Sequence, residues 1–143
     1  MVSGRSLNGE LKLGSTREIQ TIDNDDSGAI TVSNTGDSIT TYSKDSNAFV
    51  VQSVAGGGGY VAKSEEKLTL GSTKESNVSS GNLDIYNASN IDTFGDSSAG
   101  LVAQTVSGGG GFVGSTTATE ITLGGESVRN GGGGSIQLRN IGD

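Results

Sequence analysis

The chain contains nearly the same stretch of sequence twice. Residues 48–61 read AFVVQSVAGGGGYV, and residues 99–113 read AGLVAQTVSGGGGFV. The two glycine blocks begin at Gly56 and Gly108, an interval of 52 residues. Self-similarity at a fixed period is typical of proteins in which each copy stacks on the one before it. The repeat therefore favours a stacked, repetitive fold over a single catalytic domain.

Two shorter blocks set the register of the copies. A pair of aliphatic residues followed by glycine recurs over 11–14, 68–71 and 121–124. A block that begins with glycine and ends with asparagine recurs over 28–34, 81–87 and 134–140. We therefore treat residues 1–143 as one continuous domain, with repeats at approximately 11–67, 68–120 and 121–143, the last of them partial.

The aliphatic residues in these blocks alternate with polar ones. Ile30 and Val32 are separated by one residue, and the pairs Leu83/Ile85 and Ile136/Leu138 repeat the spacing. Period-two alternation indicates short β-strands, and no window has the apolar spacing of a helix. The sequence thus predicts an all-β fold, a parallel β-helix (β-solenoid) in which Ile30, Leu83 and Ile136 lie above one another. Because 52 residues is long for one coil, we expect two or three coils in each copy.

Two kinds of amide side chain recur at matched positions. Asn34, Asn87 and Asn140 end their blocks, and Gln52 and Gln104 lie among apolar residues. Inward amides at equal heights can hydrogen-bond to the coils above and below, so we expect structural roles for all five. For the asparagines, a plain turn after a strand is the alternative.

The glycine blocks do not have the pattern of a nucleotide-binding loop. Neither of the first two, nor the third at residues 131–134, is followed by the Lys–Ser/Thr pair that such a loop needs. We expect them to permit close backbone approach, either between coils or between neighbouring molecules. The glycines given this structural role are Gly56, Gly57, Gly58, Gly59, Gly108, Gly109, Gly110 and Gly111.

An acidic stretch resembles half of a calcium loop. Asp23, Asp25 and Ser27 would supply oxygen ligands at positions 1, 3 and 5, with Gly28 at position 6. Position 12, which should be a bidentate acid, is Asn34. We favour a solvated acidic turn and predict no metal and no cofactor.

Four aromatic residues fall at matched positions in the two copies. They pack at the edge of the core or form an exposed ladder for carbohydrate or partner contact, and packing is the favoured alternative. They are Tyr42, Tyr60, Phe94 and Phe112.

Composition excludes several functions. The chain has no Cys and no His, so the commonest general base and metal ligand are absent. Its net charge of −7 and nine scattered basic residues argue against nucleic-acid binding. No stretch approaches the roughly 20 apolar residues of a membrane helix, and residues 1–6 lack the pattern of a secretion leader.

Residues 95–108 (GDSSAGLVAQTVSG) resemble the passenger repeats of large bacterial autotransporters, which are type V secreted surface proteins. Those repeats typically read close to GxSAGIxAQSIGGGGG, and the first copy here departs from them at Phe49. The resemblance covers nearly the whole chain. It implies a right-handed parallel β-helix outside an outer membrane, with a leader upstream and a β-barrel translocator downstream. It also implies a role in adhesion, aggregation or surface coating.

We therefore expect a non-enzymatic segment at the bacterial cell surface or outside the cell, adhesin-like or structural, that presents a rigid rod. Its expected partners are neighbouring repeats, further copies of itself, or a carbohydrate or host-surface ligand. One alternative is a filament subunit that self-assembles through open solenoid ends. The other is a polysaccharide-processing β-helix enzyme, for which Asp84, Asp92 and Asp96 are the acids of one copy.

Overall fold

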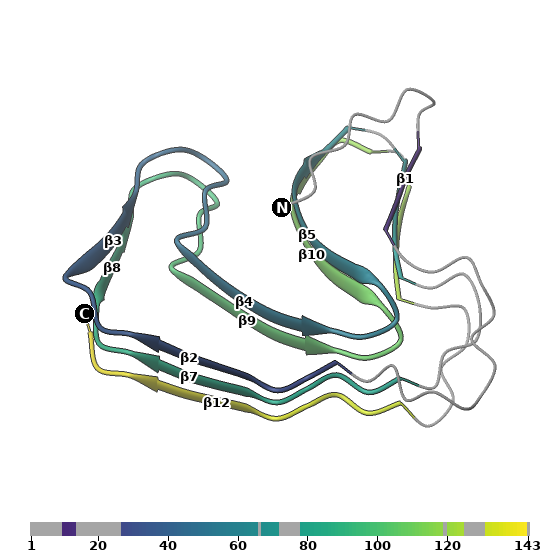
Figure 1. Ribbon diagram of the computed structural model, residues 1–143. Helices are drawn as coiled ribbons and strands as arrows, with labels where there is room; N and C mark the ends of the chain where they lie inside the picture. Colours follow the sequence, from purple (N-terminus) through teal and green to yellow (C-terminus); the bar gives the residue numbers. More distant parts are fainter. Residues whose placement is uncertain are drawn as a thin grey trace.

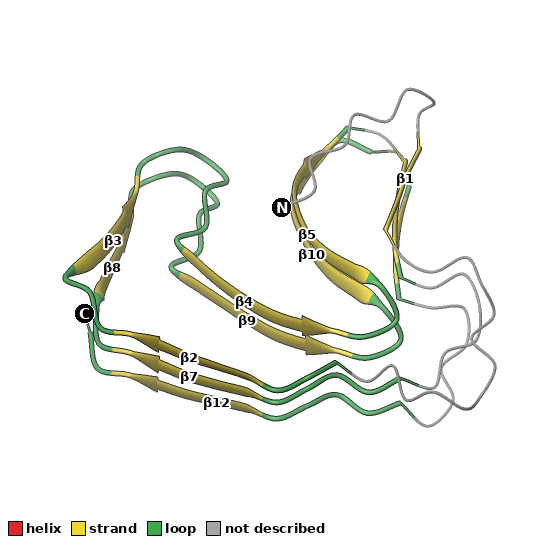
Figure 2. Ribbon diagram, viewed as in Figure 1, coloured by secondary structure: helices red, strands yellow, loops and turns green. Residues whose placement is uncertain are grey.

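The structure, a computed structural model, describes residues 10–13, 27–65, 67–71, 78–118, 120–124 and 131–142 (Figure 1). All regular structure in these ranges is β-strand, as Figure 2 shows, and none of it is a helix that could cross a membrane. The strands are β1 (Glu10–Leu13), β2 (Ile30–Asn34), β3 (Ser38–Thr41), β4 (Phe49–Val54), β5 (Gly58–Ser64), β6 (Lys67–Leu70), β7 (Leu83–Asn87), β8 (Asn90–Thr93), β9 (Leu101–Val106), β10 (Gly110–Thr116), β11 (Ile121–Leu123) and β12 (Ile136–Asn140).

Every described strand pairs in parallel with its equivalent in the next copy. The sheets have the strand orders β1–β6–β11, β2–β7–β12, β3–β8, β4–β9 and β5–β10. No described sheet joins two strands of the same copy. The predicted all-β, parallel-strand character is confirmed.

The register places matched residues on one another. Ile30 pairs with Leu83, and Leu83 with Ile136. The comparison with autotransporter repeats matches Phe49 with the glycine of their pattern, which is Gly100 in the second copy; this match is wrong, because Phe49 pairs with Leu101. The second copy therefore keeps a large apolar residue at this position, which in the first copy packs against the buried Val51, Leu83 and Ile85.

Each copy forms one layer, so the expectation of two or three coils in each copy was wrong. The first layer holds β1 to β5, the second holds β6 to β10, and the third holds β11 and β12. Figure 1 shows the reason: after β3 the chain turns inward along β4 and returns along β5, which gives the layer two lobes. This inward fold takes up the chain length that was expected to form further coils.

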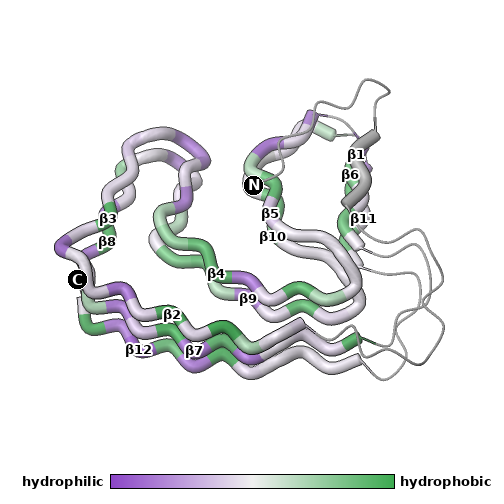
Figure 3. The backbone as a smooth tube through the Cα atoms, in the orientation of Figure 1, coloured by the Kyte–Doolittle hydropathy of each residue, from purple (hydrophilic) through white to green (hydrophobic). Residues whose placement is uncertain are grey.

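Each lobe has its own apolar core (Figure 3). The first lies between the β2–β7–β12 and β4–β9 sheets and contains Val51, Leu83 and Ile85. The second lies between β5–β10 and β1–β6–β11 and contains Val61, Leu68, Leu70 and the partly buried Val113.

Burial depends on the layer in which a residue lies. Ile85, in the middle layer, is 0% exposed, whereas its equivalent Leu138 in the third layer is 48% exposed. Burying such a side chain fully is worth about 1.5–3 kcal/mol. The core is therefore closed by stacking, and the middle layer gains the most from it.

Candidate functional site

The matched glutamines lie side by side in the β4–β9 sheet. Gln52 Nε2 donates a hydrogen bond to Gln104 Oε1 at 2.6 Å, and both residues are partly buried. The amide of one layer thus satisfies the amide of the next. The arrangement joins the first layer to the second.

The matched asparagines form a continuous column across all three layers. Asn34 Nδ2 donates to Asn87 Oδ1, and Asn87 Nδ2 donates to Asn140 Oδ1, each at 2.7 Å. Asn87 is fully buried, and its Nδ2 also donates to the Ser89 carbonyl at 2.7 Å. These residues lie where the β2–β7–β12 sheet turns toward β3–β8. The column therefore supplies polar partners to Asn87, which is closed to water in the middle layer, whereas Asn140 is exposed in the third.

The first two glycine blocks make the turn that brings β5 back from β4. All eight glycines from Gly56 to Gly59 and from Gly108 to Gly111 have positive φ, between 75° and 142°. Side chains rarely adopt this conformation. A Cβ on Gly58 would also lie 1.8 Å from the carbonyl oxygen of Gly110 in the next layer. Glycine is required here by both the turn and the stacking.

The backbone amides of these glycines hydrogen-bond to carbonyl groups of the adjacent layer. The Gly109 amide donates to the Ala55 carbonyl at 2.6 Å, and the Gly110 amide donates to the Gly57 carbonyl at 3.1 Å. We expected close backbone approach either between coils or between neighbouring molecules. The contacts that these glycines make are between layers of one molecule.

The third glycine block is not a copy of the other two. Gly134 has the position in the third layer that Gly28 has in the first and Gly81 in the second, two residues before the strands of the β2–β7–β12 sheet. A Cβ on Gly134 would lie 2.1 Å from the Gly81 carbonyl oxygen. The match of residues 134–140 with 28–34 and 81–87 is confirmed, and Gly134 permits close backbone approach between layers of this sheet.

The calcium candidate is only partly described. Asp23 and Asp25 lie outside the described residues. The Ser27 hydroxyl is 2.7 Å from the Ser53 hydroxyl and accepts a hydrogen bond from the Gly81 amide at 3.0 Å. Ser27 thus uses its oxygen within the fold. Among the described residues, no group of three acidic side chains could hold a metal ion.

The serine contacts belong to a polar column that sequence reasoning missed. Ser53 is 2% exposed and accepts from the Gly81 amide at 2.9 Å. In the next layer, Thr105 Oγ1 donates to the Gly134 carbonyl at 2.8 Å. The available signal was the match of Ser53 with Thr105, two hydroxyl residues at one inward position.

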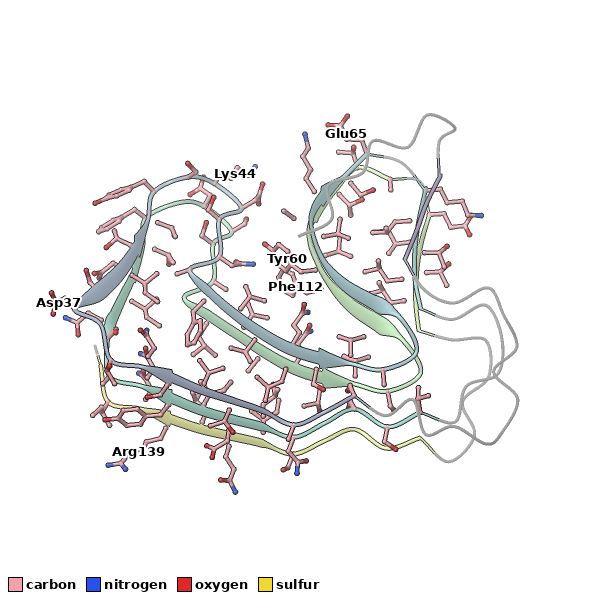
Figure 4. The ribbon with its side chains drawn as sticks, in the orientation of Figure 1. Asp37, Lys44, Tyr60, Glu65, Phe112 and Arg139 are labelled. Atoms are coloured by element: carbon pink, nitrogen blue, oxygen red, sulfur yellow. The ribbon has the colours of Figure 1, made fainter. Side chains whose placement is uncertain are left out.

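The aromatic residues divide into two stacked pairs. Tyr42 and Phe94 have ring centroids 5.3 Å apart and are 75% and 68% exposed, so the exposed ladder describes them better than core packing. Tyr60 and Phe112, with centroids 5.4 Å apart, are partly buried and lie between β4–β9 and β5–β10 (Figure 4). Both distances suit offset stacking.

Tyr60 also makes a contact between the lobes that sequence reasoning missed. Asn47 Nδ2 donates to the Tyr60 hydroxyl at 3.0 Å. In the second copy these positions hold Ala99 and Phe112, so the amide and the hydroxyl are lost together. This paired change was the available signal.

We expect Tyr60→Phe to destabilise the fold by about 0.5–1.5 kcal/mol, because it leaves the partly buried Asn47 amide with one partner fewer. The measurement is urea unfolding of the wild type, Tyr60→Phe, Asn47→Ala and the double variant. The cycle should give a coupling energy of about 1 kcal/mol. Additive effects would show that the two side chains do not interact.

The described ion pairs are exposed. Lys63 and Glu65 are 2.5 Å apart, and their hydrogen bond raises the pKa of the lysine and lowers the pKa of the glutamate. Lys67 and Glu120 are 2.9 Å apart and link the second layer to the third. Such pairs are screened by water and salt, so they contribute little beside the buried columns.

Comparison with protein-family models, with curated proteins and with solved structures found no match to this chain. The observations that bear on its function are the stacking of the repeats and the resemblance of residues 95–108.

Proposed function

We propose that this chain is a non-enzymatic structural segment, a parallel β-helix in which each repeat forms one coil of a rigid rod. The observation that carries the proposal is the pairing of every described strand with its equivalent in the adjoining copy. A further copy can then be added without changing the cross-section. The right-handed preference of crossovers between parallel strands supports a right-handed coil.

The proposed rod displays a wide surface and gains little length. Parallel strands lie about 4.8 Å apart, so each repeat of some fifty residues lengthens the rod by about that amount. Outward positions recur at the same interval. On the outer face of β3–β8 these are the pairs Ser38/Asn90, Thr40/Asp92 and Tyr42/Phe94. Repeated weak contacts at a fixed spacing are the basis of multivalent binding.

We infer an extracellular or bacterial cell-surface setting from the resemblance to autotransporter passenger repeats. The absence of cysteine in the sequence and the net charge of −7 are compatible with an exported, well-solvated surface. In this setting the segment is adhesin-like or a structural part of a passenger. Its contacts are with neighbouring repeats and with carbohydrate or host-surface groups.

The proposal is tested by adding three copies of residues 68–120 after residue 120. If each copy forms one layer, small-angle X-ray scattering should show the molecule longer by about 14 Å in total. Three separately folded units would each add about 25 Å, the diameter expected for a compact unit of this size. A gain of the second kind would reject the rod.

A further inference from the structure

A pair of aromatic rings stands on the outer face of the β3–β8 sheet. Tyr42 and Phe94 are 75% and 68% exposed, and their rings are parallel to within 9° with centroids 5.3 Å apart. Carbon atoms in direct face-to-face contact would be about 3.5–4.0 Å apart. The two rings are therefore displaced sideways, and part of each ring face stays open to solvent.

This exposure comes from the outward direction of the rings and not from the ends of the stack. Alternation along β3 and β8 turns Tyr42 and Phe94 away from the core. A further layer on either side would extend the column and leave its outer edge open. The β2–β7–β12 sheet gives the example, since Asp84 is exposed although Thr31 and Gln137 flank it on both sides.

The surroundings of the rings are acidic. Residues 36–47 and 88–99, which hold β3, β8 and the turns beside them, contain four aspartates and one lysine. Asp92 lies two residues before Phe94 on the same outward face, about 7 Å along the strand. Among the described residues, no cation lies over either ring and Asp92 makes no ion pair. Open ring faces beside a carboxylate attract a cation.

The molecule already holds a cation on another outward aromatic ring. Asp84 and Tyr86 in β7 have the same spacing on the outward face as Asp92 and Phe94 in β8. The guanidinium of Arg139, from the adjacent layer, lies over the Tyr86 ring at 5.6 Å from its centroid. An acid and an aromatic residue two positions apart therefore accommodate an arginine on this fold.

We propose that the outer face of β3–β8 binds arginine side chains of a basic protein segment. The guanidinium lies against the open faces of Tyr42 and Phe94, and its N–H groups donate to the Asp92 carboxylate. Arginine suits this face better than lysine, because its planar group stacks on a ring and holds its donors in a fixed geometry. The acidic surroundings favour a cation over a neutral glycan. The inference builds on the proposed function, since it names a partner for a face that the rod displays.

The test measures binding of labelled peptides to the full chain by fluorescence anisotropy. The probe alternates arginine with glycine; one analogue carries lysine in place of arginine, and another carries citrulline, which has nearly the same shape without the charge. We expect saturable binding that is tightest for arginine, weaker for lysine and absent for citrulline. Replacing both rings by leucine, Tyr42→Leu with Phe94→Leu, keeps an apolar surface and should weaken binding of the arginine peptide about fivefold.

The carboxylate is tested with a matched pair of variants at physiological ionic strength, where exposed charges more than about 8 Å apart are largely screened. Asp92→Asn should weaken binding about threefold. Asp84→Asn removes the same charge from an outward position whose neighbouring ring is already covered by Arg139. It should change binding by less than about 1.5-fold.

The proposal is overturned if the citrulline peptide binds as tightly as the arginine peptide, if the leucine double variant binds like the wild type, or if the two aspartate variants behave equally. Binding of a cello-oligosaccharide to the rings without binding of the arginine peptide would also overturn it, and would assign the face to carbohydrate. None of these results would change the scattering expected from added repeats, so failure here is separable from failure of the proposed rod.

Discussion

Replacing Gly81 with alanine should destabilise the protein by about 3 kcal/mol or more, because the new Cβ would lie 2.1 Å from the Gly28 carbonyl oxygen of the adjacent layer. The backbone cannot yield locally, since the neighbouring residues are fixed by the β2–β7 pairing. The measurement is the free energy of unfolding in urea, with circular dichroism to detect loss of strand. Domains of this size are stable by only about 5–15 kcal/mol, so partial unfolding of the purified variant is also expected.

Gly28→Ala is the matched control. Gly28 occupies the same column in the first layer, and its Cβ would meet no described atom within 4 Å. This variant should change stability by less than about 1 kcal/mol. Equal losses for the two variants would show that the clash between layers does not exist.

Replacing Asn87 with alanine should cost about 2–4 kcal/mol. The change leaves Asn34 Nδ2 and the Ser89 carbonyl without their partner in a corner where Asn87 and Ser89 are 0% and 1% exposed. Thermal and urea unfolding would measure the loss.

Asn140→Ala provides the comparison within the same column. Asn140 is exposed, so water can replace its contact and the loss should be about 1 kcal/mol. A loss at Asn87 no greater than that at Asn140 would contradict the buried column.

Local patterns predicted the strands and their partners well. Alternation in the block of Ile30 and Val32 placed β2, and matching of the copies placed Ile30 on Leu83 and Leu83 on Ile136. These features succeed because period two and repeat register are written directly in the order of residues.

Features that depend on the path of the chain within a layer were missed. The inward turn between β4 and β5 depends on positive φ at Gly56 to Gly59, and composition does not distinguish this block from Gly131 to Gly134. The Asn47–Tyr60 contact joins two lobes whose approach follows only from that turn. The two cores follow from the same turn, which separates the chain of one layer into two lobes.

The central claim, that one repeat forms one layer, is tested most directly by paired cysteines in this cysteine-free chain. Thr31, Asp84 and Gln137 occupy one outward column in consecutive layers. Adjacent layers place Cα atoms about 4.8 Å apart, within the disulfide range of about 4.4–6.8 Å, whereas two layers place them about 9.6 Å apart. Under mild oxidation, Thr31→Cys/Asp84→Cys should therefore form an intramolecular disulfide readily, and Thr31→Cys/Gln137→Cys should not. Failure of the first pair with ready formation of the second would contradict the account.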